Sequence, residues 1–486
     1  MVLGTTSGAG KSWLATALCR WAAREGLRVA PFKAQNMSNN ARVVAGLDGA
    51  EGEIGSAQYF QALAARVVPD VRMNPVLLKP ESDTRSQYVL LGQVDETLTR
   101  TPWRERGALA WPRVTAALDD LRREHDVVVI EGAGSPAEIN LADSDHVNLR
   151  VARHADARCL LVTDIDRGGA FAHLYGTWAL MPESDRARLD GFVLNRFRGD
   201  AALLAPGPEQ LRALTGVPTV ATLPMWWQHG LPEEDGLHDL RPHAAGPVRL
   251  TIAVIAYPRI SNLDEFQPLR NIPGVRLVWA RSPADMAAAD WIILPGSKHT
   301  SADLQWLRAQ GLDAAVAAHA ARGAPVLGVC GGLQMLGEAL IDANAIDGNG
   351  PGLGLLPLVT QFERAKTVRR REIAFGEVQG PWSALAGVQW QGYEIHHGRT
   401  VPHPAMAPGH VVLPDDLGWQ NAAGNVLGLY LHGLFESPAV LQALFGGQVP
   451  TLDSVFDGLA AFVDRHFAPG VLPALFGLPR GDAPAP

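Results

Sequence analysis

Residues 324–340, APVLGVCGGLQMLGEAL, decide the fold of the half of the chain in which they lie. The apolar run at 325–329 predicts a buried parallel strand, and the apolar spacing from Leu333 onward predicts a helix directly after it. Between the two stands Gly-x-Cys-x-Gly, the layout of a nucleophile elbow with sulfur in place of the serine oxygen. The stretch therefore indicates an α/β fold with Cys330 at the carboxyl end of a strand.

The residues around Cys330 suit a nucleophilic thiol. The flanking glycines permit a tight turn with no Cβ in the way, and the N-terminus of the following helix favours a thiolate. Backbone N–H groups beside the cysteine, including that of Gly331, can hold an oxyanion. The alternative is a small buried hydrophobe, because free cysteines usually sit inert in protein cores. The motif favours the nucleophile over this alternative.

The stretch around Cys330 resembles the nucleophile segment of class I, triad-type glutamine amidotransferases, which release ammonia from glutamine through a Cys–His pair. His432 follows a predicted strand at 427–431, so the order Cys330…His432 fits this class. The histidine would take the thiol proton and later protonate the departing ammonia. The resemblance also implies that Gly296, in a Pro-Gly loop after a predicted strand at 291–294, offers its N–H to the oxyanion.

The third member of the triad is not assigned by the sequence. The class places an acid two residues after the histidine, but Leu434 stands there in this chain. Glu436, one helical turn further on, is only a candidate. His396 and His397 are competing bases, which we interpret as loop and interface residues.

Composition limits the class of protein. A chain of 486 residues is too long for one ordinary core, so two or more domains are expected. Three cysteines without a CxxC pair argue against disulfides and structural zinc, and for a reducing compartment. A net charge of -8 without a basic run argues against nucleic acid as a partner. No apolar run reaches the roughly 18 residues that span a bilayer, and no signal peptide is visible, so we expect a cytoplasmic protein without a membrane partner.

A glycine-rich loop follows the first predicted strand. Residues 4–12, GTTSGAGKS, lead into a helical pattern that runs to Arg24. Such a loop cradles phosphate with its backbone N–H groups, while the lysine reaches the terminal phosphates and the last serine can bind Mg²⁺. The candidate ATP-binding residues here are Thr6, Gly8, Gly10, Lys11 and Ser12.

The spacing of this loop is longer than that of the strict P-loop, since five residues rather than four separate its first glycine from Gly10. The longer form resembles the loop of dethiobiotin-synthetase-like P-loop enzymes, which phosphorylate a carboxylate or carbamate. A chance glycine-rich turn is the alternative. Lys33, at the end of a predicted strand at 27–33, is a second candidate phosphate cation or a snorkelling surface lysine. Asn195, after a predicted strand at 191–195, is a candidate adenine reader or a cap.

Two carboxylates are candidate Mg²⁺ ligands besides Ser12. Glu131 follows an all-apolar predicted strand at 126–130, and the carboxyl edge of an open α/β sheet is where ligands bind. Burial of Glu131 without a cation would be costly, although a structural role is the alternative. Glu53 stands at the start of a predicted helix, where it could lie near the metal or be an exposed first-turn acid.

Four segments resemble a single family, the glutamine-dependent cobyric acid synthases of the cobalamin pathway. They are PFKAQNMSNN at 31–40, EIGSAQ at 53–58, IEGAGSPAEINL at 130–141 and DIDRGG at 164–169. The resemblance implies amidation of adenosylcobyrinic acid a,c-diamide at its b, d, e and g carboxylates. Such a polycarboxylate needs local cations, and the candidate substrate-binding residues are Lys79, Arg85, Asp166 and Arg167.

These motifs predict an α/β protein of two domains, each a mostly parallel sheet flanked by helices. We expect a P-loop NTPase-like synthetase domain at 1–235, a linker at 236–248 and a flavodoxin-like class I amidotransferase domain at 249–445. Residues 446–486 would form a C-terminal helix and a disordered tail. The apolar spacing at 452–467 predicts that this helix packs on the second domain.

An ATP site that activates a carboxylate and a cysteine site that releases ammonia together indicate ATP-driven amide synthesis. The expected cofactors are ATP and Mg²⁺, with L-glutamine as ammonia donor and a corrinoid as the small-molecule partner. Three alternatives stay open: cobyrinic acid a,c-diamide synthase, a peptidoglycan-precursor amidating enzyme, and a non-enzymatic P-loop regulatory ATPase. Assembly into a homo-oligomer is also left open by the sequence.

Overall fold

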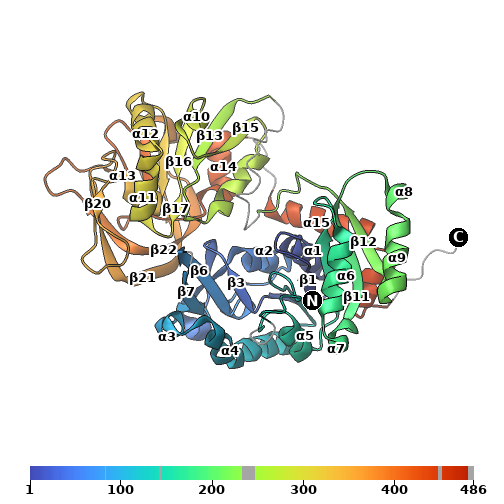
Figure 1. Ribbon diagram of the computed structural model, residues 1–486. Helices are drawn as coiled ribbons and strands as arrows, with labels where there is room; N and C mark the ends of the chain where they lie inside the picture. The colour runs from blue at the N-terminus through green and yellow to red at the C-terminus, as the bar shows by residue number, and fades with distance from the viewer. Residues whose placement is uncertain (83, 142–144, 233–246, 447–450, 480–486) are drawn as a thin grey trace.

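The computed structural model describes residues 1–82, 84–141, 145–232, 247–446 and 451–479. Figure 1 shows two α/β halves, the first blue to green and the second yellow to orange, with the red helix α15 lying against the first. The α/β fold class with two parallel-sheet halves is confirmed. Most of the predicted linker (236–246) and the whole of the predicted tail (481–486) lie outside the described residues.

The first half is built on parallel strands, and the glycine-rich loop follows the first of them. β1, β10, β11 and β12 form one parallel sheet, and β2 pairs in parallel with β9. A bridge between Val2 and Glu131 joins β9 to β1, so the loop and Glu131 leave neighbouring strands at one edge. The bounds are β1 (Val2–Gly4), α1 (Lys11–Arg24), β2 (Val29–Phe32), α4 (Trp103–Glu124), β9 (Val127–Ile130), α5 (Leu149–Ala155), β10 (Cys159–Asp164), α6 (Ala170–Leu180), α7 (Glu183–Arg186), β11 (Leu189–Phe197), α8 (Ala201–Leu204), α9 (Pro206–Thr215) and β12 (Thr219–Pro224).

Smaller sheets extend this half toward the second one. β4 and β5 form an antiparallel hairpin, and β3 pairs with β6, which continues through β7 to β8. The helix predicted at 57–67 is α2, which starts at Ser56, but Glu53 lies on the strand β5 before it and not in a first helical turn. The bounds are β3 (Gln35–Met37), β4 (Ala41–Ala45), β5 (Glu51–Gly55), α2 (Ser56–Ala64), β6 (Val76–Ser82), β7 (Arg85–Leu90), β8 (Gln93–Val94) and α3 (Glu96–Arg100), with short 3-10 turns η1 (Leu47–Gly49) and η2 (Val71–Met73).

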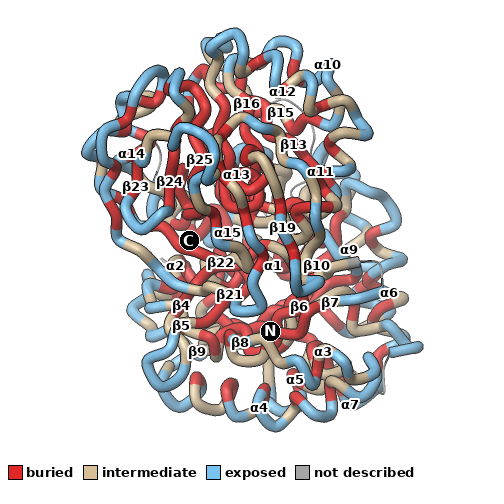
Figure 2. Tube along the Cα trace, turned by 90° about the vertical axis from the view of Figure 1, so that its left-hand side faces the viewer, coloured by how far each residue is buried: buried red, intermediate tan, exposed pale blue. Residues whose placement is uncertain are grey.

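The second half contains a seven-stranded sheet in the order β15-β13-β16-β18-β25-β24-β23. The strands from β15 to β25 are parallel, and β24 and β23 add an antiparallel edge. In Figure 2 the strands of this half are buried inside it, while exposed segments surround them. The bounds are β13 (Leu250–Ile255), β15 (Val275–Ala280), α10 (Pro283–Met286), β16 (Trp291–Leu294), α11 (Thr300–Ala309), α12 (Leu312–Ala321), β18 (Val326–Val329), α13 (Gly331–Leu336), β23 (His410–Leu413), β24 (Gly418–Gln420), β25 (Val426–Leu429) and α14 (Pro438–Phe445).

A long hairpin, β21–β22, reaches from this half to β4 and β5 of the first. It places residues of both halves side by side over the hairpin β4–β5. The remaining elements are β14 (Ile260–Ser261), η5 (Leu263–Asn271), β17 (Gly296–Ser297), β19 (Ala339–Ile341), β20 (Gly350–Pro351), β21 (Leu358–Ala374), η6 (Gly380–Leu385), β22 (Gln389–Pro402), η7 (Leu434–Glu436), α15 (Leu452–His466) and α16 (Val471–Leu475).

The C-terminal helix packs on the first half, and the prediction that it packs on the second is wrong. α15 shares a hydrophobic core with α1, and its acids pair with two α1 residues. Arg20 is bonded to Asp457 at 2.8 Å and to Asp453, and the Trp21 indole donates to Asp464 at 2.8 Å. Helical spacing shows that a helix has an apolar face but not which surface covers it. Among the described residues, no helix is long and apolar enough to cross a membrane.

Candidate active site

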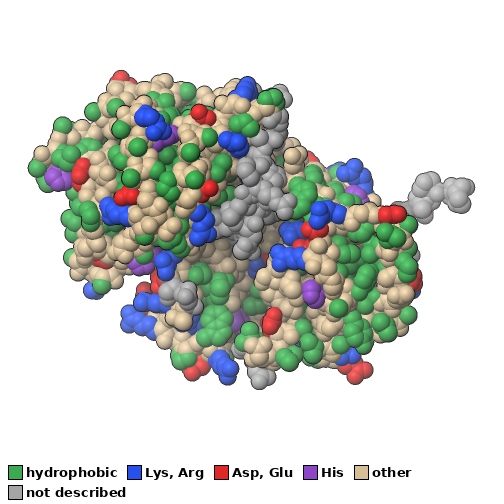
Figure 3. All heavy atoms as spheres, turned by 45° about the horizontal axis from the view of Figure 1, so that its top comes forward, with side chains coloured by type: hydrophobic (Ala, Val, Ile, Leu, Met, Phe, Trp, Pro, Cys, Tyr) green, Lys and Arg blue, Asp and Glu red, His purple; other side chains and the backbone are tan. Residues whose placement is uncertain are grey.

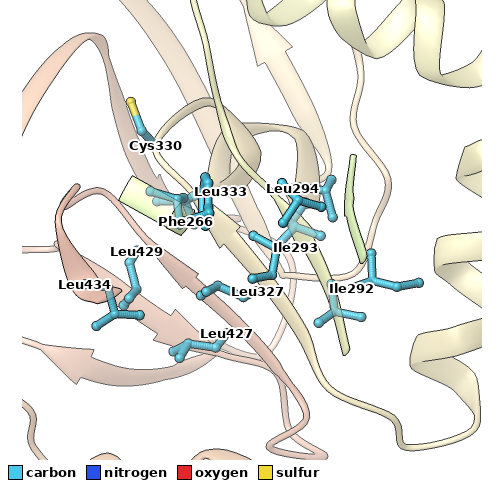
Figure 4. Packing of buried hydrophobic residues seen from close by; sticks show 14 of the residues in the cluster. Phe266, Ile292, Ile293, Leu294, Leu327, Cys330, Leu333, Leu427, Leu429 and Leu434 are labelled. Atoms are coloured by element: carbon cyan, nitrogen blue, oxygen red, sulfur yellow. The ribbon is translucent and has the colours of Figure 1, made fainter. Parts of the chain in front are cut away.

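Cys330 lies on a strained turn between β18 and α13. Its backbone has φ 51 and ψ -106, a positive-φ conformation that residues with a side chain rarely adopt. The two flanking glycines make the turn feasible, because a Cβ on Gly332 would lie 1.9 Å from the Leu294 carbonyl oxygen and one on Gly328 would lie 2.7 Å from the carbonyl carbon of Gly332. Figure 4 shows the Cys330 sulfur pointing away from the packed leucines and isoleucines of the core. The elbow thus has the predicted form.

Four functional candidates gather at one edge of the sheet. Cys330 follows β18 and His432 follows β25, which are parallel neighbours. Gly296 follows β16 on the other side of β18, and Glu265 follows β13 beyond it. Because the carboxyl ends of parallel strands meet at the same edge, residues far apart in sequence come together here.

Glu265 orients His432, and the sequence reasoning missed it. One oxygen of its carboxylate lies 2.8 Å from the His432 Nδ1, and the other accepts the backbone N–H of Gly433 at 2.8 Å. Both Glu265 and His432 are buried. Cys330 is close enough to the imidazole to raise its pKa, and the Cys330 thiol also donates to the Ile395 carbonyl at 3.7 Å. Cys330, His432 and Glu265 therefore form a triad-like chain of contacts.

The charges around His432 favour its protonated form. Burial lowers the pKa of His432, but the Glu265 carboxylate and the Cys330 sulfur outweigh it and raise that pKa to about 10. A histidine of this kind is an imidazolium at neutral pH, the form that pairs with a thiolate. The Tyr393 ring stacks on the imidazole, with centroids 5.4 Å apart.

Glu436 does not take the position of the triad acid. Its carboxylate is bonded to the Arg42 guanidinium, which comes from the first half. The competing histidines also have other partners, and both lie on β22 rather than in a loop. His396 contacts Glu394 at 3.0 Å, and burial together with nearby lysines lowers the pKa of His397 to about 4.

The two predicted oxyanion residues lie beside the catalytic pair. A Cβ on Gly296 would come within 2.7 Å of the His432 Cε1, and a Cβ on Gly331 would come within 2.8 Å of the Ser297 backbone nitrogen. Both positions therefore need glycine for the loop after β16 to pack against the elbow. Their hydrogen bonds to an oxyanion stay a prediction.

The glycine-rich loop has the organisation expected for phosphate binding. The Lys11 ammonium donates to the Thr6 carbonyl at 3.0 Å and to the Gly134 carbonyl at 3.1 Å, so it lies across the loop. Gly8 and Gly10 have φ values of 72 and 100. These conformations curl the loop and suit residues without a side chain.

Asn195 supports this loop instead of facing outward. Its amide donates to the Ala9 carbonyl at 3.0 Å, and its oxygen accepts the Arg196 N–H at 2.9 Å. A Cβ on Gly10 would lie 2.1 Å from the Asn195 amide nitrogen. This arrangement favours a brace for the loop over an adenine reader.

Glu131 is the centre of a buried polar cluster beside the loop. One of its oxygens accepts from Ser12 and Lys33, each at 2.7 Å, and the other accepts from Gln61 at 2.6 Å. Burial raises the pKa of Glu131, but Lys33 and these hydrogen bonds outweigh it and lower the pKa overall. Lys33 thus pairs with Glu131 at the edge of the nucleotide site.

The structure separates Glu53 from the Ser12–Glu131 pair. Its carboxylate is buried between Lys79, at 2.7 Å, and Lys366 of β21. Glu53 and Lys79, predicted as metal and substrate ligands, therefore bond to each other between the two halves. Among the described residues, no group of three or more His, Cys, Asp or Glu is placed to hold a metal ion.

The remaining candidate substrate residues lie in two places. Arg85 is exposed and pairs with Glu81 at 3.2 Å. Arg167 lies beside the glycine-rich loop, since a Cβ on Gly8 would be 3.6 Å from its guanidinium. Asp166 bonds to Arg198 at 2.7 Å near the same edge.

Comparisons with known proteins match both halves of the chain. Residues 1–233 match the CobQ/CobB/MinD/ParA nucleotide binding domain, and residues 251–440 match the CobB/CobQ-like glutamine amidotransferase domain. Three proteins named cobyric acid synthase are similar over nearly the whole chain. The one from Variovorax paradoxus (strain S110) is 74% identical, covering 98% of each chain. Those from Acidovorax sp. (strain JS42) and Polaromonas sp. (strain JS666 / ATCC BAA-500) are 73% and 69% identical, covering 98% and 99% of this chain and 97% and 98% of their own.

Proposed function

The chain belongs to the cobyric acid synthase family of glutamine-dependent, ATP-using ligases, and we propose that it amidates adenosylcobyrinic acid a,c-diamide at carboxylates b, d, e and g to give adenosylcobyric acid. One observation carries this proposal: a single chain holds a Cys330–His432–Glu265 chain of contacts and a glycine-rich loop closed by Lys11 and Ser12. The first fits ammonia release, and the second fits carboxylate activation.

In the amidotransferase half, the Cys330 sulfur attacks the glutamine side-chain carbonyl. The Gly296 and Gly331 backbone N–H groups hold the oxyanion, and the His432 imidazolium gives its proton to the departing ammonia. Water then releases glutamate from the thioester. Glu265 keeps the imidazole in one tautomer throughout, because its carboxylate accepts the hydrogen bond from the Nδ1–H group.

In the synthetase half, a substrate carboxylate oxygen attacks the γ-phosphorus of ATP and ADP leaves. Lys11 binds the phosphates, with Thr6, Gly8 and Gly10 forming the loop around them and Asn195 bracing it. Lys33 would add positive charge beside the phosphates from its pair with Glu131. Ammonia then attacks the acyl carbon of the acyl phosphate, inorganic phosphate leaves, and the nitrogen loses a proton to become the amide.

The oxygen donors beside the loop fit Mg²⁺. The Ser12 hydroxyl lies 2.7 Å from the buried Glu131 carboxylate, and Mg²⁺ prefers such hard oxygen ligands. Ser12 would hold the ion, with Glu131 orienting that hydroxyl, and Glu53 falls outside the set because lysines occupy its carboxylate. When bound, the ion supplies neutralisation of phosphate charge.

The corrinoid would lie between the two halves. Figure 3 shows a hollow there with lysine and arginine side chains around it, which suits a substrate with many carboxylates. Arg167 and Asp166 at the loop edge and the exposed Arg85 stay candidate contacts, whereas Lys79 would act through its bond to Glu53. Direct passage of ammonia between the sites would keep water from the acyl phosphate. We also place the protein in the cytoplasm, without nucleic-acid or membrane partners.

The proposal is tested by following glutamate release and amide mass gain on the corrinoid with ATP and Mg²⁺. We expect Cys330→Ala to abolish glutamine-supported amidation and to keep amidation with added ammonium. Lys11→Ala should abolish both. Cobyrinic acid without its a and c amides is the control acceptor, because its preferred use would favour the a,c-diamide synthase. ATP hydrolysis without amide formation, and glutamate release that ignores Cys330, would favour the regulatory ATPase.

A further inference from the structure

A segment of the synthetase half, residues 40–42, is bonded to the start of η5, the turn that carries Glu265. The Asn40 side-chain oxygen accepts the Leu263 N–H at 3.0 Å, and the Ala41 N–H donates to the Asn262 side chain at 3.1 Å. All four of these residues are buried. The loop that supplies the triad acid is thus fixed from outside its own half of the chain.

Arg42 continues this contact with a buried charge. Its side chain is only 1% exposed, and it donates to Asp264 at 2.6 Å, the residue directly before Glu265. The same guanidinium nitrogen also binds Glu436, three residues after Gly433. The rings of Phe60 and Tyr393 and the neighbouring Tyr59 lie 5.2 to 5.8 Å from the guanidinium carbon.

One guanidinium therefore binds both chain segments that hold the catalytic histidine. Glu265 is attached to His432 and Gly433, and Arg42 is attached to the residues that flank these two sites in sequence. Tyr393, against which Arg42 lies, also exchanges two backbone hydrogen bonds with His432 at 2.9 and 3.2 Å. A shift of Arg42 would therefore move Asp264 and Glu436, and with them the separation of Glu265 and His432.

We propose that Arg42 of the synthetase half is a positioning residue for the glutaminase, holding Glu265 and His432 at their hydrogen-bonding distance. This inference rests on the glutaminase part of the proposed function. Buried ion pairs gain little net stability over apolar packing, so a buried arginine with two acids suits a role in geometry. Small displacements of catalytic groups cost up to about 100-fold in rate.

The test compares Arg42→Met, Arg42→Lys and a matched control, Arg20→Met. Arg20 is also a fully buried arginine bonded to two acids, but these belong to α15. Each variant is measured for glutamate release, for amidation with glutamine, and for amidation with added ammonium. The rate at which iodoacetamide alkylates Cys330, located by peptide mass, reports the reactivity of the sulfur beside the imidazole and needs no corrinoid.

We expect Arg42→Met to lower kcat for glutamine hydrolysis about 10- to 100-fold, with KM changed less than about threefold. Cys330 alkylation should slow, and ammonium-supported amidation should stay within about twofold of the wild type. Arg42→Lys, which keeps the charge but lacks the planar guanidinium, should recover part of the loss. Arg20→Met should change glutamine- and ammonium-supported amidation by the same factor.

If Arg42→Met lowers the rates of glutamine-supported and ammonium-supported amidation equally, or leaves glutamine hydrolysis unchanged, the proposal is overturned. If Arg42→Met does not fold, Arg42→Met with Asp264→Asn neutralises the fully buried one of the two acids that lose their partner, and the same comparison is made on that double variant and on Arg42→Lys. Failure of the proposed function looks different: the wild type would release glutamate and react at Cys330 but add no amide mass to the corrinoid.

Discussion

Replacement of Glu265 by glutamine removes one acceptor at the centre of the glutaminase. Its two carboxylate oxygens each accept one N–H, from the His432 ring and from the Gly433 backbone, both at 2.8 Å. A carboxamide has one oxygen and one NH₂ group, so Glu265→Gln can satisfy only one of these two donors. Either the Gly433 N–H faces another donor, or His432 must change to the wrong tautomer.

Both outcomes are costly because the site is buried. A buried donor without a partner costs about 1–3 kcal/mol, and the wrong tautomer carries its proton on the nitrogen that faces Cys330, so it cannot take the thiol proton. We therefore expect kcat for glutamine hydrolysis to fall about 10²- to 10⁴-fold, equivalent to about 3–5 kcal/mol of transition-state stabilisation. Amidation with added ammonium should stay within about twofold, since Glu265 contacts only the amidotransferase site.

The assay is steady-state glutamate release beside ammonium-supported amidation, with the unfolding transition in urea as a check on folding. Glu436→Gln is a matched control for the alternative triad acid, because its carboxylate binds Arg42 and not the imidazole. Glutamine hydrolysis within a few-fold of the wild type for Glu265→Gln, or a larger loss for Glu436→Gln, would refute this reasoning.

The same pair predicts a pH dependence of stability. The pKa of His432 is raised from 6.5 to about 10, so its contribution to stability is complete below pH 6.5 and is lost as pH rises through about 10. Without the Glu265 charge most of this contribution disappears. The difference in free energy of unfolding between wild type and Glu265→Gln should therefore shrink between pH 6.5 and 10.

Three further predictions concern other parts of the structure. Glu53→Gln should destabilise the protein by about 3–5 kcal/mol in urea unfolding, because two buried lysines lose their partner. The control Glu51→Gln, on the same strand, removes only an exposed pair and should cost less than about 1 kcal/mol. Gly332→Ala should abolish glutamine hydrolysis and lower the melting temperature, since its Cβ would meet a backbone oxygen at 1.9 Å, whereas Gly350→Ala, with nothing within 4 Å, should behave like the wild type. Asn195→Ala should raise the Kd of ATP and the Kd of GTP by the same factor. A loss of affinity confined to ATP would instead support a role for Asn195 in binding adenine.

Part of this arrangement could be predicted from the sequence, because it depends on the ends of parallel strands. Cys330 and His432 each follow an apolar run, so the shared carboxyl edge of the sheet brings them together wherever they stand in the chain. The same reasoning located the glycine-rich loop and Glu131 at one edge of the first half. Motif and strand end together are enough for such sites.

The partners of buried charges could not be predicted in the same way. Glu53 has the sequence setting of a first-turn acid, but Lys366, more than 300 residues away, reaches it across the boundary between the halves. The C-terminal helix likewise had an apolar face that we assigned to the wrong half, and the sequence signal for its true partner was Arg20 within the apolar pattern of α1. Contacts between halves depend on the docked shape and not on local spacing.

The position of the triad acid follows from both effects. The acid can come from the segment after another strand of the same sheet, so Glu265, on η5 after β13, can serve a histidine after β25. The acid pair Asp264-Glu265 was the available signal. Glu436 cannot serve because Arg42 of the other half binds it. Arg42 of the synthetase half binds both Asp264, next to Glu265, and Glu436 behind the histidine, so the same surface covers both positions. The position of Glu265 therefore makes the geometry of the glutaminase depend on contact with the synthetase half, and Arg42→Met tests this dependence.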